Sequence, residues 1–165
     1  MYSRDKEFKY NPVKVKSRFM LPMESFRYTG QISNKTGLPE NHGIGNTYIF
    51  GIFWAGRYTG FWHNGYVNGF GVLEASTQGK IKLFTYVSTI VHVLSLKGPL
   101  TGAYFVGFWD NGTISSYESK KATLRYLSGA IFKGIFNSYG PIYGTITYKS
   151  GNSYTGDKYE YMQTF

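Results

Sequence analysis

A short motif of aromatic residues and glycines, repeated along the chain, constrains the fold more than any other feature. In its best copy, YTGFWHNGYVNGFGVL, an aromatic residue is followed by glycine two positions later, by a second aromatic at four, and by glycines at seven, eleven and thirteen. Repetition of this kind is typical of proteins built from one stacked supersecondary unit. Copies of the motif begin at Tyr28, Tyr58, Phe105, Phe132 and Tyr154.

Each copy has the pattern of a β-hairpin. Side chains alternate between the two faces of a strand, so the aromatics at positions zero and four lie on one face. The sequences HNG (His63–Gly65) and DNG (Asp110–Gly112) are strong signals for tight hairpin turns. Glycines on the return strand leave room for the rings of the neighbouring unit. Because a single hairpin is unstable in water, we expect the hairpins to stack side by side and share a core.

The spacing of the copies predicts one further unit. The interval from Tyr58 to Phe105 is about twice the intervals between the later copies, so we expect a sixth unit, without glycine signals, within Lys80–Gly102. The apolar run LFTYVSTIVHVLSL lies in this interval and is rich in β-branched and aromatic residues, which favours buried strands. The run is shorter than the roughly 20 residues that a membrane-spanning helix needs.

The best copy resembles the MORN repeat (membrane occupation and recognition nexus), whose pattern is Y-x-G-x-W-x-N-G-x-x-x-G-x-G. The copy FVGFWDNG, at Phe105–Gly112, is similar to the first half of that pattern. The resemblance implies an all-β fold, an elongated twisted antiparallel sheet of successive β-hairpins. The expected organisation is a basic N-terminal arm at 1–25, a repeat domain of about six units at 26–159, and a C-terminal tail at 160–165.

The formal net charge of +9 is carried mostly by the two ends of the chain. Six of the 18 lysines and arginines precede Phe19, and six more follow Glu118, whereas the middle of the chain is nearly balanced. Basic ends suit an acidic protein surface, an anionic lipid or nucleic acid, and charge alone does not choose among these partners. A basic surface that serves only solubility is an equal alternative.

Few residues of this chain suggest catalysis. The absence of cysteine excludes disulfides, thiolate zinc sites and a cysteine nucleophile. The histidines, His42, His63 and His92, are dispersed and form no spaced metal set, and the carboxylates form no acid–base pair. We therefore expect no enzyme activity, no cofactor, no metal and no small-molecule substrate.

Nucleic acid is not an expected partner either. The segment TGAYFVGF, at Thr101–Phe108, partly mimics the RNP1 strand of RNA-recognition motifs, but Ala103 and Tyr104 depart from it. The repeat frame accounts for Phe105 and Gly107 without that comparison. Most bases also lie outside the aromatic pattern, unlike the interleaved arrangement of a single-strand binder.

The resulting hypothesis is a non-catalytic scaffolding subunit that docks other polypeptides of a larger complex. The MORN resemblance implies such a role, often at cilia, the cytoskeleton or membranes. The N-terminus lacks the apolar segment of a secretory signal, so we expect an intracellular protein, ciliary or cytoskeletal, or alternatively mitochondrial. The alternative function is a peripheral module whose basic ends bind anionic membrane lipids.

Two sets of residues are candidates for partner contact. The first is an aromatic groove, although each of its rings has the alternative role of a stacked core residue; its members are Tyr58, Trp62, Phe105, Trp109, Phe132, Phe136 and Tyr154. The second is a set of basic contacts: Lys14, Lys16, Arg18, Lys120 and Lys121.

Overall fold

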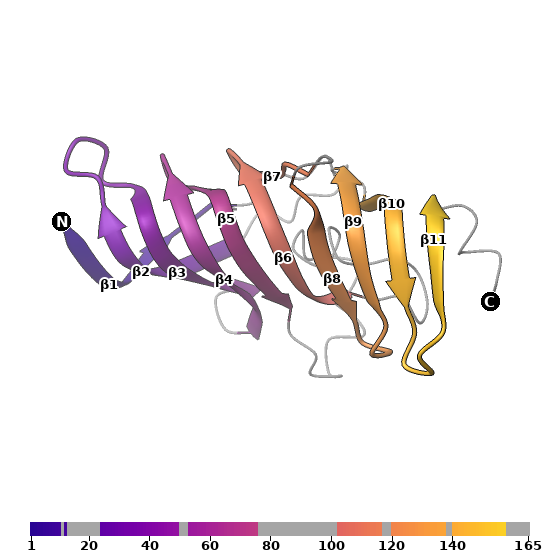
Figure 1. Cartoon of the computed structure of the whole chain (residues 1–165). Coiled ribbons are helices and arrows are strands. Elements are labelled where there is room, and N and C mark those ends of the chain that lie inside the picture. The colour runs from indigo at the N-terminus through magenta and orange to yellow at the C-terminus, as the bar shows by residue number, and fades with distance from the viewer. Residues whose placement is uncertain are drawn as a thin grey trace.

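The protein is an open antiparallel β-sheet of 11 strands, formed by successive hairpins (Figure 1). The computed structural model describes residues 1–10, 12, 24–49, 53–75, 102–116, 120–137 and 140–157. The strands are β1 (Tyr2–Phe8), β2 (Glu24–Ile32), β3 (Pro39–Ile49), β4 (Phe53–His63), β5 (Tyr66–Ala75), β6 (Gly102–Asp110), β7 (Thr113–Ile114), β8 (Ala122–Tyr126), β9 (Ile131–Asn137), β10 (Gly140–Thr147) and β11 (Ser153–Asp157).

Strands that are neighbours in the chain are also neighbours in the sheet. The order is β1-β2-β3-β4-β5-β6-β8-β9-β10-β11, and the short β7 pairs with β6. Figure 1 shows this progression from the N-terminal end on the left to the C-terminal end on the right. The five copies of the motif begin on β2, β4, β6, β9 and β11. The predicted all-β sheet of successive hairpins is therefore confirmed.

Two features of the sheet bear on the expected organisation. Residues 2–8, expected to belong to an N-terminal arm, form β1 and pair with β2. Strand β5 pairs directly with β6, with Leu73 opposite Phe105, whereas the sixth unit expected within Lys80–Gly102 lies outside the described residues except for Gly102, the first residue of β6. The apolar run at 83–96, expected to form buried strands, lies outside the described residues.

The inner face of the sheet, defined here as the face that carries the motif aromatics, has a row of glycines beneath the rings. A Cβ atom on Gly60 would lie only 2.6 Å from the Tyr58 hydroxyl oxygen, and one on Gly134 would lie 2.9 Å from the Phe132 ring. The aromatic-x-glycine spacing of the motif is therefore a steric requirement, because each ring lies against the backbone two residues on. Alanine replaces glycine at one position of the row, whose members are Gly30, Gly43, Gly60, Gly71, Gly107, Ala122, Gly134, Gly144 and Gly156.

The two predicted Asn-Gly turns are present and stack along the sheet. Asn64 and Gly65 have φ of 46° and 83°, and Asn111 and Gly112 have 45° and 87°. Positive φ at both central residues is the geometry of a type I′ hairpin turn. The amide of Gly65 donates to the Pro39 carbonyl at 2.9 Å, and that of Gly112 donates to the Val67 carbonyl at 2.8 Å. Each turn is thus bonded to the unit before it.

Candidate functional site

The rings proposed as a partner-binding groove lie in the core. Tyr58, Trp62, Phe105, Trp109, Phe132 and Phe136 are at most 3% exposed, and Tyr154 is partly buried against them. The structure therefore places them in the role of stacked core residues, which was the alternative to a groove. In this conformation the six buried rings offer a partner almost no accessible surface.

These rings form a continuous chain of contacts from one hairpin to the next. The Tyr58 ring lies edge-on to Trp62 at 5.3 Å and to Trp109 at 5.9 Å between ring centres. The Phe105 ring contacts Trp109 at 5.3 Å and Phe136 at 5.2 Å. Edge-to-face pairs at such distances are favourable beyond the area they bury. The aromatic spacing of the motif thus joins separate units into one core.

Tyr10 adds a contact to this core that the motif did not predict. Its ring packs edge-on against Phe26 at 5.2 Å, and its hydroxyl donates to the Gly65 carbonyl at 2.9 Å. Burial, and secondarily the neighbouring Tyr66, raises the pKa of the Tyr10 hydroxyl far above its ordinary value. Just beyond it, the carbonyl of Pro12 accepts a hydrogen bond from the Val67 amide. The chain therefore crosses the inner face after β1.

The outer face of the sheet, opposite the motif aromatics, carries exposed apolar side chains. Phe61 is 49% exposed and Phe70 is 47% exposed, and Ile44 on β3 is 36% exposed. The Phe70 ring contacts that of Phe108 at 5.3 Å, and Phe61 contacts the ring of His42 at 5.6 Å. Phe61 and Phe108 each directly precede a motif tryptophan, and this position was the available sign in the sequence that they lie on the outer face. Adjacent residues of a strand point to opposite faces.

The predicted basic contacts have different outcomes. Lys14, Lys16 and Arg18 lie outside the described residues. Lys120 and Lys121 come immediately before β8, and the Lys120 ammonium lies over the Phe108 ring at 5.1 Å from its centre. The structure thus brings Lys120 beside an outer-face aromatic that was not among the candidates.

The side chains of His63 and Glu40 are hydrogen-bonded at the turn between β4 and β5. The His63 Nδ1 atom lies 2.8 Å from Glu40 Oε1, and the Asn64 amide donates to Glu40 Oε2 at 3.1 Å. Burial raises the pKa of the Glu40 carboxyl, but the hydrogen bonds from His63 and Asn64 outweigh it and hold that pKa below its usual value. The Glu40 carboxylate therefore links the start of β3 to the turn between β4 and β5.

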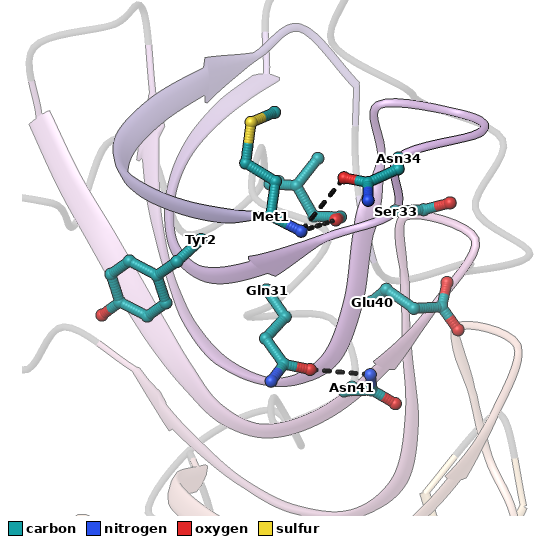
Figure 2. A pocket seen from close by; sticks show the side chains of 8 residues that line it. Met1, Tyr2, Gln31, Ser33, Asn34, Glu40 and Asn41 are labelled. Atoms are coloured by element: carbon teal, nitrogen blue, oxygen red, sulfur yellow. Dashed lines mark hydrogen bonds between the residues drawn. The ribbon is translucent and has the colours of Figure 1, made fainter.

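A pocket of about 450 Å³ lies beside Glu40 (Figure 2). The Met1 amino group donates to the Ile32 carbonyl at 3.0 Å and to Asn34 Oδ1 at 3.1 Å. Figure 2 also shows Gln31 and Asn41 facing each other, and the Asn41 amide donates to Gln31 Oε1 at 2.7 Å. These bonds join the N-terminus, the end of β2 and the start of β3. Its lining is Met1, Tyr2, Gln31, Ile32, Ser33, Asn34, Glu40 and Asn41.

The described part of the chain contains no group of three or more His, Cys, Asp or Glu side chains placed to hold a metal ion. It also contains no helix long and apolar enough to cross a membrane.

The sequence matches no protein-family model and no curated protein.

Proposed function

We propose that this protein is a non-catalytic, MORN-like scaffolding subunit that docks other polypeptides in a larger assembly. The observation that carries the proposal is the contrast between the two faces of the sheet. The inner face is occupied by the motif rings, whereas Phe61 and Phe70 on the outer face are about half exposed. Contiguous exposed apolar side chains on a soluble protein commonly mark an interaction site.

The bonded polar side chains support the same proposal, because they link neighbouring strands and hairpins of the sheet. Arg57 on β4 and Glu74 on β5 face each other across the outer face, with 2.6 Å between nitrogen and oxygen. Glu40 fixes the turn that carries Asn64. These pairs join adjacent strands or adjacent hairpins, as expected for a scaffold that presents a fixed surface to its partners. A ciliary, cytoskeletal or mitochondrial assembly remains our proposal for its location.

The test is purification of the tagged full chain from its own cells under mild detergent, followed by mass spectrometry of the co-purifying material. We expect stoichiometric recovery of one or more protein partners. Recovery of the chain alone would contradict the proposal. Recovery with anionic lipid and no protein would instead support a peripheral membrane module.

A further inference from the structure

Three asparagines of the sheet are each followed by glycine in the sequence, namely Asn64, Asn68 and Asn111. An asparagine in this position is prone to deamidation, because glycine has no side chain to keep its amide nitrogen away from the asparagine carboxamide. From the surroundings of the three sites we infer that the folded sheet protects Asn64 and Asn68 and that Asn111 is the site of deamidation. This modification is a property of the sheet itself and does not depend on the docking function.

The reaction at each site takes place within the chain. The glycine amide nitrogen loses its proton and attacks the Cγ atom of the preceding asparagine. A carbon–nitrogen bond forms there, the bond from Cγ to the carboxamide nitrogen breaks, and ammonia leaves. Water then opens the resulting five-membered succinimide ring to aspartate or isoaspartate, and nothing is oxidised or reduced. The rate therefore depends on how readily the glycine amide loses its proton and how freely the carboxamide turns towards it.

The glycine amides of both turns are hydrogen-bonded to the preceding unit of the sheet. The Gly65 amide donates to the Pro39 carbonyl at 2.9 Å, and the Gly112 amide donates to the Val67 carbonyl at 2.8 Å. Loss of either proton would leave a negatively charged nitrogen against a carbonyl oxygen, so the turn has to open before the attack. Local opening is easiest where few contacts hold a segment. The ease of opening therefore sets the rate at each turn.

The three sites differ in the strands that hold them. Asn64 lies between β4 and β5, which have 11 and 10 residues and pair with each other. Asn111 lies between β6 and β7, and β7 has only two residues. Asn68 lies within β5, where a register shift towards β4 follows it, but Gly69 is paired with Trp109 of β6. Opening at Asn111 therefore breaks the fewest hydrogen bonds.

The carboxamides of the three asparagines are also held to different degrees. Asn68 Oδ1 accepts the Asn111 amide at 3.0 Å, and Asn64 Nδ2 lies 3.1 Å from His63 Nε2. Within the residues that the structure describes, no hydrogen bond reaches the Asn111 carboxamide, and Asn111 is exposed. This carboxamide can turn towards Gly112 without breaking a bond. Asn111 is therefore the least protected site by both criteria.

Deamidation at Asn111 changes a link between two hairpins. An isoaspartate product carries the backbone through its Cβ atom, which lengthens the turn. We expect the longer turn to displace the Gly112 amide from the Val67 carbonyl, to which it is bonded at 2.8 Å. An aspartate product keeps the backbone path and adds a negative charge beside Asp110. The isoaspartate product is thus the one that loosens the turn from β5.

The test is incubation of the full chain at neutral pH, below its unfolding temperature, followed by digestion and mass spectrometry of each site. A parallel incubation in urea gives the rates in the unfolded chain. We expect similar rates at the three sites in urea, because glycine follows each asparagine. In the folded chain we expect Asn111 to react about tenfold faster or more than Asn64 and Asn68, as for a difference of roughly 1.4 kcal/mol in opening free energy.

Two variants test whether the preceding hairpin protects each turn. Asn68→Ala removes the acceptor of the Asn111 amide and should speed the reaction at Asn111 alone. Glu40→Ala removes the acceptor of the Asn64 amide and should speed the reaction at Asn64 alone. The control Lys35→Ala, at an exposed lysine, should change neither rate. Hydrogen exchange in β4 and β5 checks that each variant keeps the folded sheet.

Other rate patterns would overturn the inference. One is a folded chain in which Asn64 or Asn68 reacts at least as fast as Asn111. Another is a folded chain in which Asn111 does not react at all while the unfolded chain does. Equal effects of one variant on both turns, including no effect on either, would show that the bond from the preceding hairpin does not protect its turn.

Discussion

At the scale of single residues, two tryptophans at equivalent positions of the repeat differ in their hydrogen bonds. Trp62 and Trp109 both occupy the second aromatic position of the motif, and both are buried. The Trp62 indole N–H donates to the Gly43 carbonyl at 3.2 Å, whereas the Trp109 indole N–H has no hydrogen-bond partner in the part of the chain that the structure describes. Phe136 holds the same position in the Phe132 unit, so a phenyl ring fits the site.

Replacing each tryptophan by phenylalanine should therefore have unequal effects. Both substitutions lose ring volume, but only Trp62→Phe leaves a buried carbonyl without its donor. We expect Trp62→Phe to cost about 1 kcal/mol more of unfolding free energy than Trp109→Phe. Urea denaturation of the two variants measures the difference. Equal losses would show that the hydrogen bond to Gly43 contributes nothing to stability.

The buried tyrosines predict a loss of stability at high pH. Burial, and next the nearby Glu40 carboxylate, raises the pKa of the Tyr28 hydroxyl to about 12. An unfolded tyrosine titrates at about 10, so above that pH the unfolded state loses its proton first and gains in relative stability. The contribution of Tyr28 is therefore complete below about pH 10 and disappears as the pH approaches 12.

Urea denaturation at several pH values between 8 and 12, with ~0.5 unit steps, checks this direction. The Tyr28→Phe variant should show a shallower fall of unfolding free energy than the wild type. The substitution Tyr143→Phe, at an exposed tyrosine of β10, serves as the control and should keep the wild-type slope. The pKa of Tyr58 is also raised mainly by burial, so the unfolding free energy of both variants should still fall somewhat at high pH. A Tyr28→Phe slope equal to that of the wild type would contradict the assignment.

At the scale of elements, the unit of structure is a hairpin whose turn is held by the hairpin before it. The carboxylate of Glu40 accepts the Asn64 amide at 3.1 Å, and the side chain of Asn68 accepts the Asn111 amide at 3.0 Å. Two residue types thus perform the same task in successive units. Each acceptor belongs to the hairpin before the one whose turn it holds. No pattern within a single copy of the motif can therefore identify it.

Removing either acceptor should weaken one turn and leave the other intact. We expect Glu40→Ala and Asn68→Ala each to lower the unfolding free energy by roughly 0.5 to 1.5 kcal/mol, because each removes a hydrogen bond to an exposed backbone amide of a turn. The two turns share no partner, so the double variant should equal the sum within about 0.5 kcal/mol. Thermal or urea unfolding measures all three, with the exposed Lys35→Ala as the control. Losses no larger than that of the control would mean that water replaces the acceptors.

At the scale of the whole molecule, the sheet is open and its two edges differ. Strand β1 has a register shift between Ser3 and Lys6, and Asp5 there has a φ of 52°. Bulges and charged residues of this kind protect an edge from pairing with other chains. Strand β11 at the opposite edge is five residues long and pairs with β10. Each strand depends on its neighbours in turn, so stability should decrease from the middle of the sheet towards β11.

Hydrogen exchange measured by mass spectrometry tests this gradient. Amides of β4 and β5, paired on both sides within the array, should exchange only on global unfolding. Amides of β11 should exchange faster by at least about tenfold, because local opening of an edge strand breaks few contacts. Uniform protection across the sheet would indicate that the whole array unfolds as one unit.

The sequence by itself determined the hairpin unit, the two Asn-Gly turns and the set of rings that share a face. Each of these follows from local physics, namely side-chain alternation, the positive φ that Asn64–Gly65 adopts, and the fit of a ring over glycine two residues on. The fold class could be predicted because every copy repeats the same local rule.

Only the tertiary structure decided which role the rings take and which strands meet. Trp62 and Trp109 have the same sequence pattern whether they line a groove or fill a core, because burial depends on what packs over a face. The direct pairing of β5 with β6, and the adjacency of Phe108 to Lys120, join residues far apart along the chain or on separate strands. Such contacts are set by register between strands, and no local pattern encodes that register.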